Sequence, residues 1–246
     1  DKIADTICWT IKKNYLYKND IMNLDIIASN KWKRPIYFTT ISSVHDYLDI
    51  DNYSVVEGWL NKFIPVKADP EDYLSGLGGV DPLNSYDIFM HKSAWGNLAD
   101  PHVYIDPETR NNAFRPKTNI LRTAQSLIHM GEKKKALDLM DLYFKRFPYQ
   151  KFPVDMDDAI YANLYYRAGE IEKANGIVKL IAKVYNEDLD YYYSFTGDFA
   201  TAYKDDIQNG LEMLHSLQML AAQNKQDKLA KEMEAIFNRQ VAKYKE

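Results

Sequence analysis

The residues that most often carry chemistry in proteins are scattered along this chain instead of standing at motif spacing. No two of its five histidines are four residues apart and no His-Glu-x-x-His string occurs, so nothing indicates a zinc hydrolase. The histidines are His45, His91, His102, His129 and His215. Cys8 is the only cysteine, which excludes an internal disulfide and a cysteine-based zinc site. We therefore expect no bound metal and no cofactor.

Two other candidate motifs fail on their spacing. An EF-hand loop that began at Asp49 would need Gly at its sixth place and Glu at its twelfth, where the chain has Ser54 and Leu60. The glycine cluster at 76–79 lacks the third glycine of a dinucleotide fingerprint, because Asp81 stands in its place. The sequence therefore predicts no catalytic residue.

The segment 67–115 is the part of the chain that best suits an enzyme site. It is rich in proline and glycine, has one expected short helix at 85–92, and is longer than most connections in compact chains. A hydrolase or transferase site there would need Asp100, His102 and Trp95 to converge in a pocket. We keep this interpretation as an alternative.

The composition is that of a folded globular chain, with 46% hydrophobic and 27% charged residues. A formal net charge of −4 provides no basic field of the kind that nucleic-acid binding requires, so we expect no nucleic-acid partner. No apolar run approaches the roughly 20 residues of a membrane span, so we expect no direct membrane insertion by this segment. The sequence leaves the oligomeric state open.

The first part of the chain has the pattern of a small mixed α/β unit. Residues 18–30 form an expected helix that Asn19 or Asp20 would cap. The run 34–41 is rich in β-branched and aromatic residues, and a second strand is expected at 57–66. The helix has an expected buried face of four apolar residues, Ile21, Leu24, Ile27 and Ala28.

From residue 116 onward the pattern is helical and repeats. A shift of 38 residues places Gly131 on Gly169 and Ala136 on Ala174, and the apolar positions of the two segments then coincide. Glycine at each turn supplies the left-handed residue that ends the first helix of a hairpin. This repeat is typical of helical hairpins of the tetratricopeptide type.

A third, degenerate hairpin fits at a shift of 93, with Asn224 in the place of the turn glycine. Residues 187–209 are then an insertion, and the last helix, 225–243, has the charged outer face of a terminal cap. We predict an α+β fold, mostly α. A mixed α/β unit with its long connection would occupy 1–110 and pack on a tetratricopeptide-like array at 111–246.

The repeats suggest one binding surface. In arrays of this type the first helix of each hairpin lines the concave face. Polar side chains lie on that face beside the buried stripe, and the candidates are Arg122, Gln125, His129, Asn163 and Arg167. This strip could bind the carboxylates or main chain of an extended peptide. The alternative is that the first part of the chain covers it, or that it is simply solvated.

A carbohydrate-binding module is a further possibility for the first part of the chain. Aromatic rings provide stacking surfaces for sugars, and the candidates are Trp32, Tyr37, Trp59 and Trp95. Burial of these rings in the core is the alternative. Exposure of two or more rings on one face would favour sugar binding.

The string Asn30–Phe38, with the sequence NKWKRPIYF, resembles a motif in the soluble tails of bacterial membrane proteins related to protein O-mannosyltransferases. Proteins of that family begin with a multi-span glycosyltransferase-like domain and end in a soluble region with tetratricopeptide-like repeats. The resemblance covers most of 18–185. Further matching residues are Glu57-Gly58, Pro65, Tyr86–Met90, Trp95–Asn97, Asp100-Pro101 and Val103-Tyr104.

The resemblance implies that the chain is an excised tail on the periplasmic side of the inner membrane, as part of a membrane protein. The presumed catalytic acid of the family lies in its membrane part, so no catalytic residue is carried over. The leading hypothesis is a non-catalytic extracytoplasmic interaction domain of a membrane-bound glycosyltransferase-like protein. Its expected partner is a protein or peptide, and the membrane part of the same chain is one candidate.

Overall fold

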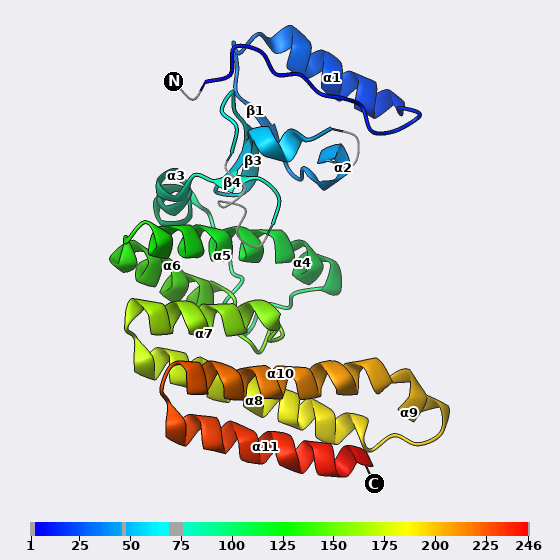
Figure 1. Ribbon diagram of the computed structural model, residues 1–246, viewed down its shortest axis with the longest axis vertical. Coiled ribbons are helices and arrows are strands. Elements are labelled where there is room, and N and C mark those ends of the chain that lie inside the picture. The colour runs from blue at the N-terminus through cyan, green and yellow to red at the C-terminus, as the bar shows by residue number, and fades with distance from the viewer. Residues whose placement is uncertain (1–2, 46–47, 69–75, 246) are drawn as a thin grey trace. The chain divides into compact units, whose positions relative to one another are not determined.

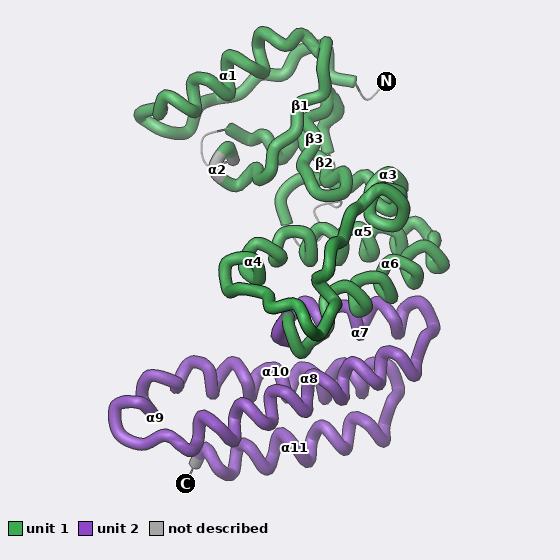
Figure 2. The backbone as a smooth tube through the Cα atoms, turned by 180° about the vertical axis from the view of Figure 1, so that it is seen from behind, with its two compact units in different colours: residues 1–151 green, residues 152–246 purple. Residues whose placement is uncertain are grey.

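The structure is a computed structural model that describes residues 3–45, 48–68 and 76–245 (Figure 1). It divides into two compact units, Asp1–Lys151 and Phe152–Glu246, which Figure 2 colours separately and which are described one at a time below. The first unit combines a small sheet with helices, and the second is helical over its described residues. The predicted α+β class with helix predominating is confirmed.

The first helix, α1, spans Lys18–Asn30, which is the predicted range, but its cap differs from the prediction. Neither Asn19 nor Asp20 precedes the helix, because Tyr17 holds the capping position. Asp20 stands in the first turn, and its carboxylate accepts a hydrogen bond from the backbone N–H of Tyr17 at 3.0 Å. The carboxylate satisfies a terminal donor from inside the helix.

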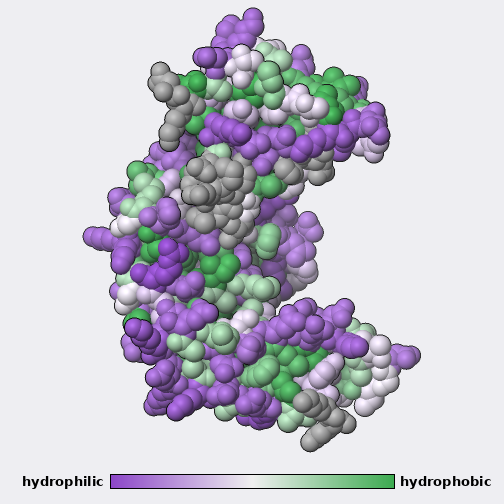
Figure 3. All heavy atoms as spheres, in the orientation of Figure 1, coloured by the Kyte–Doolittle hydropathy of each residue, from purple (hydrophilic) through white to green (hydrophobic). Residues whose placement is uncertain are grey.

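The buried face of α1 is also rotated from the prediction. Leu24 and Ile27 pack on the hydrophobic core as expected, and Asp20 is buried on the same side. Ile21 is 55% exposed and Ala28 is exposed, although both were expected to face inward. Positions 20, 24 and 27 recur at helical spacing and define the inward stripe. Hydrophobic side chains consequently remain on the surface along α1 (Figure 3).

A four-stranded sheet forms the centre of the first unit, with strand order β1-β3-β2-β4. Its strands are β1 (Ile36–Phe38), β2 (Ser54–Glu57), β3 (Leu60–Phe63) and β4 (Gly79–Val80). β3 pairs antiparallel with both β1 and β2, and β4 pairs parallel with β2. The strand predicted at 57–66 is confirmed as β3, but it is shorter than predicted, because the chain turns at Gly58, whose φ of +66° is left-handed, and Glu57 belongs to β2 of the same hairpin.

The pairing fixes which side chains share a face of this sheet. Asn61 stands opposite Phe38 on one side and Val56 on the other, so these three side chains project to one face. Tyr37 stands opposite Lys62, and this pair projects to the other face. Asn61 therefore turns toward the buried side of the sheet, where Val56 is fully buried.

The chain after β4 forms α3 (Pro82–Asp87), which continues into a π-helical turn, η3 (Ile88–Lys92). The helix predicted at 85–92 is confirmed in place but begins at Pro82. The hydroxyl of Ser85 connects this segment to the β2–β3 hairpin by two hydrogen bonds. It accepts from the Gly58 N–H at 2.9 Å and donates to the Val56 carbonyl at 3.1 Å.

The remaining elements of the first unit lead into the first helical hairpin. They are α2 (Ser42–His45), η1 (Ile50–Tyr53), α4 (Pro107–Asn112), α5 (Phe114–His129) and α6 (Lys133–Arg146). α5 and α6 pack on each other, and α5 also contacts α3 and β4. Fully buried side chains hold the hairpin together; they are Ile120, Leu121, Ala124, Leu127, Ala136, Leu139 and Met140.

The second unit contains two further hairpins. Its helices are α7 (Met156–Ala168), α8 (Ile171–Tyr192), α9 (Asp198–Ala202), α10 (Lys204–Gln223) and α11 (Asp227–Lys245). The stretch 187–209, expected as an insertion, is largely helical because α8 and α10 are extended and α9 lies between them. Ring contacts join the ends of these helices through Tyr191, Tyr192, Phe195, Phe199 and Tyr203.

The three hairpins share one turn geometry. Gly131 and Gly169 are left-handed, with φ of +81° and +96°. In the third hairpin Asn224 has φ of −92°, and Lys225 adopts the left-handed conformation at +59°. The prediction that Asn224 replaces the turn glycine is therefore wrong by one residue. The Asn224 side chain instead donates to the carbonyl of Leu220 at 2.8 Å, which also accepts the backbone N–H of Asn224 at 3.2 Å.

No helix among residues 3–45, 48–68 and 76–245 is both long and apolar enough to cross a membrane. The division at residue 110 into two sequence domains stays a prediction. The division into compact units falls after Lys151 in the chain, because α5 and α6 pack with α3, η3 and β4 within the first unit.

Candidate functional site

The second unit contains a groove of about 680 Å³ between α7 and α10, the first helices of its two hairpins. Apolar side chains make up much of its lining; they are Met156, Ala159, Ile160, Tyr185, Met213, Met219 and Leu220. Polar side chains complete it; they are Asn163, Asn209, Glu212, His215, Ser216 and Gln223. The groove thus combines a hydrophobic surface with amide and hydroxyl groups that can bond a peptide main chain.

Two exposed methionines of this groove suit a ligand with apolar side chains. Met156 is 73% exposed and Met219 is 46% exposed, although both are apolar. Methionine is unbranched and polarizable, so it adapts to ligand shape. Tyr185 adds a hydroxyl, whose pKa is raised above its usual value by burial and then by the charge of Asp155. That hydroxyl is a hydrogen-bond donor in the lining.

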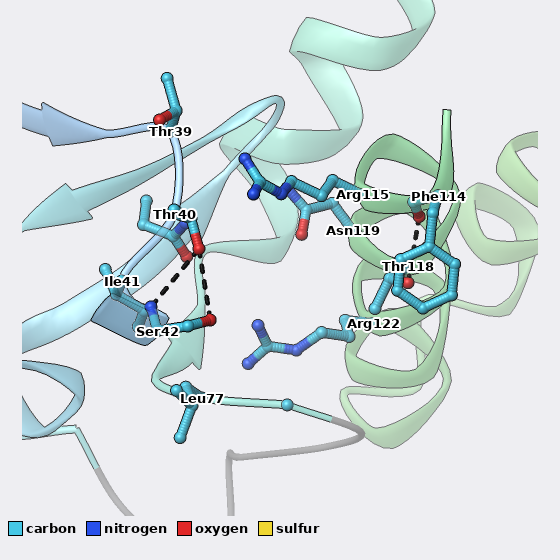
Figure 4. A pocket seen from close by; sticks show the side chains of 12 residues that line it. Thr39, Thr40, Ile41, Ser42, Leu77, Phe114, Arg115, Thr118, Asn119 and Arg122 are labelled. Carbon is cyan, nitrogen blue, oxygen red and sulfur yellow. Dashed lines mark hydrogen bonds between the residues drawn. The ribbon is translucent and has the colours of Figure 1, made fainter. Parts of the chain in front are cut away.

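The first unit contains a separate pocket of about 320 Å³ between α5 and the chain that leaves β1 (Figure 4). Its α5 wall consists of Arg115, Thr118, Asn119 and Arg122. Each of these positions is three or four residues from two of the others, so they share one face of the helix. Phe114 belongs to the same lining and is 60% exposed.

The opposite wall of this pocket is the segment from Thr39 to Ser42, which joins β1 to α2. Its hydroxyls are close together, with 3.3 Å between the Thr40 and Ser42 oxygens. Figure 4 shows these hydroxyls and the guanidinium groups of Arg115 and Arg122 on facing sides of the pocket. Two cationic groups therefore face a row of hydroxyls.

Arg122 is a buried part of this pocket. It is 3% exposed, and its guanidinium donates a hydrogen bond to the carbonyl of Gly78. The same group packs against Gly76, where a Cβ atom would lie 3.3 Å from the guanidinium carbon. The chain at 76–78 thus covers Arg122 and fixes the direction of its side chain.

Asn61 contributes a buried amide to the pocket. Its side chain is 9% exposed and projects from the inner face of β3. Within the described part of the chain, no group forms a hydrogen bond with this amide. A water molecule or ligand in the pocket can supply the missing bonds.

Arg115 differs from Arg122 because it is exposed. No carboxylate of residues 3–45, 48–68 and 76–245 forms an ion pair with it. It lies two turns before Arg122 on the same helix face. The pocket therefore has one guanidinium fixed by the fold and one at its open end.

The predicted peptide-binding strip is divided between the two units. Arg122, Gln125 and His129 lie on α5; Arg122 is buried under 76–78, whereas His129 is exposed. Asn163 and Arg167 lie on α7 and are both exposed, and Asn163 lines the groove. The structure assigns Arg122 to the pocket and Asn163 to the groove, and binding by the strip stays a prediction.

The four aromatic rings predicted to bind sugars do not form one surface. Trp59 and Trp95 contact each other in the core, with 5.1 Å between their centroids, and Trp95 is 8% exposed. Trp32 is half exposed but stacks on Phe63, on the inner face of the sheet. Tyr37 projects from the other face and donates a hydrogen bond to Glu57 at 2.6 Å. Sugar binding by these rings stays untested.

The residues proposed for an enzyme site in 67–115 have structural partners. The Asp100 carboxylate accepts a hydrogen bond from the His102 backbone N–H at 2.9 Å, which closes a turn. The Trp95 indole donates to the carbonyl of Phe89 at 3.3 Å. Among residues 3–45, 48–68 and 76–245, no group of three or more His, Cys, Asp or Glu side chains could hold a metal ion.

Sequence reasoning missed Arg115, Asn119 and Asn61. The first two could have been found from their spacing, because Arg115 and Asn119 continue the polar face of Arg122 at intervals of three and four residues. Asn61 could not have been found in this way, because its inward direction depends on the unexpected hairpin at Gly58.

Comparison with known proteins gives one family match. Residues 1–82 match the model of TMEM260-associated domain 2. This span contains α1 and all four described strands and ends at the beginning of α3, so the helical hairpins lie outside it. No curated protein and no solved structure matches the chain.

Proposed function

We propose that this chain is a non-catalytic recognition domain that binds a peptide segment of a protein partner in the groove between α7 and α10. The groove itself carries this proposal. It lies between the first helices of consecutive hairpins, which is where helical repeat arrays present their binding surface. Its volume of about 680 Å³ falls within the roughly 300–1,000 Å³ of ordinary ligand sites.

The chemistry of the lining selects the kind of peptide. Met156, Ile160 and Met219 offer surface to apolar side chains, and burial of one large side chain stabilises a complex by roughly 1.5–3 kcal/mol. Asn163 and Gln223 have both donors and acceptors and can bond the peptide main chain. We expect a peptide with apolar residues at two or three nearby positions, held in the groove by these groups.

A random peptide library displayed on phage and selected against the folded chain tests this proposal. We expect enriched peptides to bind with a Kd in the micromolar range, and the variant Met219→Arg to weaken them at least tenfold, because it puts a charge on the apolar surface. Met130→Arg is the matched control, since Met130 is 53% exposed but lies on the first unit. Equal affinity for both variants would contradict the proposal.

We also propose that the chain is the extracytoplasmic tail of a membrane-bound glycosyltransferase-like protein, with a periplasmic location. Two observations support this. The string at 30–38 resembles the tails of proteins related to O-mannosyltransferases, and the match to TMEM260-associated domain 2 covers the same part of the chain. In this setting the membrane part of the same protein is one candidate source of the bound peptide.

The location can be tested on the full-length natural protein with an epitope tag after Glu246. We expect added protease to remove the tag from intact spheroplasts, because an extracytoplasmic tail is accessible without lysis. A cytoplasmic protein probed in the same sample serves as the control. Protection of the tag until the membrane is permeabilised would overturn this placement.

A further inference from the structure

We propose that the pocket between α5 and the Thr39–Ser42 segment is a binding site for a small hydroxylated ligand that has one oxyanion group, either a carboxylate or a phosphate. This site lies in the first unit and is independent of the groove proposed above. The residues that carry the inference are Arg115, Asn61, Thr40, Ser42 and Phe114.

The charge of the pocket indicates an anion. Its described lining contains no acidic residue, and Arg115 is exposed there without an ion pair to any carboxylate of the described residues. Arg122 is nearly fully buried and donates to the carbonyl of Gly78, so the contact with the anion is assigned to Arg115. Guanidinium groups present several N–H donors in one plane, which matches the oxygens of carboxylates and phosphates.

The neutral groups indicate what the anion is attached to. The amide of Asn61 is nine-tenths buried and lacks a partner within the described chain, so it has both donors and an acceptor for a ligand. Thr40 and Ser42 add hydroxyls on the same side as β1. Hydroxyl groups of a ligand can both donate to and accept from such a set.

The size and the edge of the pocket limit the ligand further. A cavity of about 320 Å³ lies at the lower end of the range for small-molecule sites, so a single ring is favoured over a longer chain. Phe114, with 60% of its side chain exposed, offers a flat apolar surface beside the polar groups. A hydroxylated ring with one anionic substituent satisfies all three features.

Titration calorimetry on the full chain, with four probes, tests this inference. The probes are glucuronate, glucose 6-phosphate, inorganic phosphate and neutral glucose. We expect glucuronate, glucose 6-phosphate or both to bind with a Kd below about 1 mM, and glucose to bind at least tenfold more weakly. Tighter binding of glucuronate or of glucose 6-phosphate identifies the oxyanion as a carboxylate or a phosphate. The affinity for inorganic phosphate measures how much the anionic group contributes to binding without the ring.

Variants on the same chain locate the binding. Arg115→Gln removes the exposed guanidinium and should weaken the anionic probes at least tenfold while leaving the fold intact. Arg34→Gln is the matched control, because Arg34 is exposed and does not line the pocket. Met219→Arg, in the groove, should leave probe binding unchanged, which separates this inference from the proposed peptide site. Equal binding to the Arg115 and Arg34 variants, or no binding of the anions at 10 mM, would overturn it.

Discussion

The guanidinium of Arg122 on α5 donates a hydrogen bond to the carbonyl of Gly78, immediately before β4. Gly78 has a left-handed φ of +75°, and a Cβ atom there would lie 2.7 Å from the carbonyl oxygen of Ser54 on β2. The fold therefore needs glycine at 78 for its conformation and for its close approach to the sheet. One bond joins the helical hairpin to the strand that completes the sheet.

Replacing either partner should destabilise the first unit. Arg122→Met keeps an unbranched side chain but leaves the buried Gly78 carbonyl without this donor, which costs roughly 1–3 kcal/mol. Gly78→Ala should cost more than about 1 kcal/mol, because alanine disfavours positive φ and its methyl group would meet backbone. The free energy of unfolding in urea, followed by circular dichroism, measures both. Arg115→Met, on the same helix face but exposed, is the control, and a stability of Arg122→Met equal to that of this control would contradict the account.

Substitutions at the three hairpin turns should change the free energy of unfolding in opposite directions. Gly131→Ala and Gly169→Ala should each lower the free energy of unfolding by roughly 1 kcal/mol, since a Cβ there meets no atom within 4 Å and only the left-handed backbone opposes it. Lys225→Gly should raise it by a similar amount, because lysine now holds φ of +59°. Denaturation of the three variants in parallel gives the signs. A loss of stability in Lys225→Gly would contradict the turn assignment.

The acidic side chains at 188 and 190 should affect stability in opposite ways as the pH changes. Hydrogen bonding from Lys243 lowers the pKa of Asp190 below its usual 3.8, so its contribution is present above that value and is lost as the pH falls through the lower, folded pKa. Burial, and then the charge of Glu187, raises the pKa of Asp188, so its ionised form opposes folding until the pH falls through that raised pKa.

Asparagine variants separate these two effects. Asp190→Asn should be less stable than the parent chain at pH 7, and the difference should shrink below pH 3.8. Asp188→Asn should be more stable at pH 7, and this gain should shrink as the parent's Asp188 becomes protonated. Thermal denaturation between pH 7 and pH 3 measures both. The same sign of change for both variants at pH 7 would show that the assigned causes are wrong.

The helical hairpins could be predicted because their signal is local. Gly131 and Gly169 mark turns whose geometry depends on a few neighbouring residues, and the apolar spacing between them needs only the helical period. In the third turn the left-handed residue is Lys225 and not the predicted Asn224, because the end of the helix determines which residue adopts that conformation. A lysine can adopt it at a modest energetic cost. Local reasoning placed the hairpin but not its turn residue.

The pocket could be predicted only in part, since most of it depends on contacts between distant segments. Arg122 stood out in the sequence as a polar residue beside the buried stripe of a helix. Its burial under 76–78 depends on the parallel pairing of β4 with β2. A strand of two residues is too short for a local sequence pattern to predict it. Asn61 faces inward only because the turn at Gly58 sets its register.

Gln240 on α11 provides a last test, within the second unit. It is fully buried, and its amide nitrogen donates to the Asn186 side-chain oxygen at 2.7 Å and to Asp190 at 2.8 Å on α8. Its own amide oxygen has no partner within the described chain. Gln240→Leu loses the donated bonds but also removes this unpaired acceptor, so it should lower the free energy of unfolding by only about 1–2 kcal/mol.

Gln240→Glu should be more damaging than Gln240→Leu at neutral pH, because it puts a second carboxylate beside Asp190 in a buried site. An unpaired buried charge costs roughly 3–5 kcal/mol. Burial and the neighbouring carboxylate both raise the pKa of the introduced group, so acidification to pH 5 should restore part of the loss by protonating it. Melting temperatures of the two variants at pH 7 and pH 5 measure this difference. A Gln240→Glu chain that is as stable as Gln240→Leu at pH 7 would show that water reaches the site.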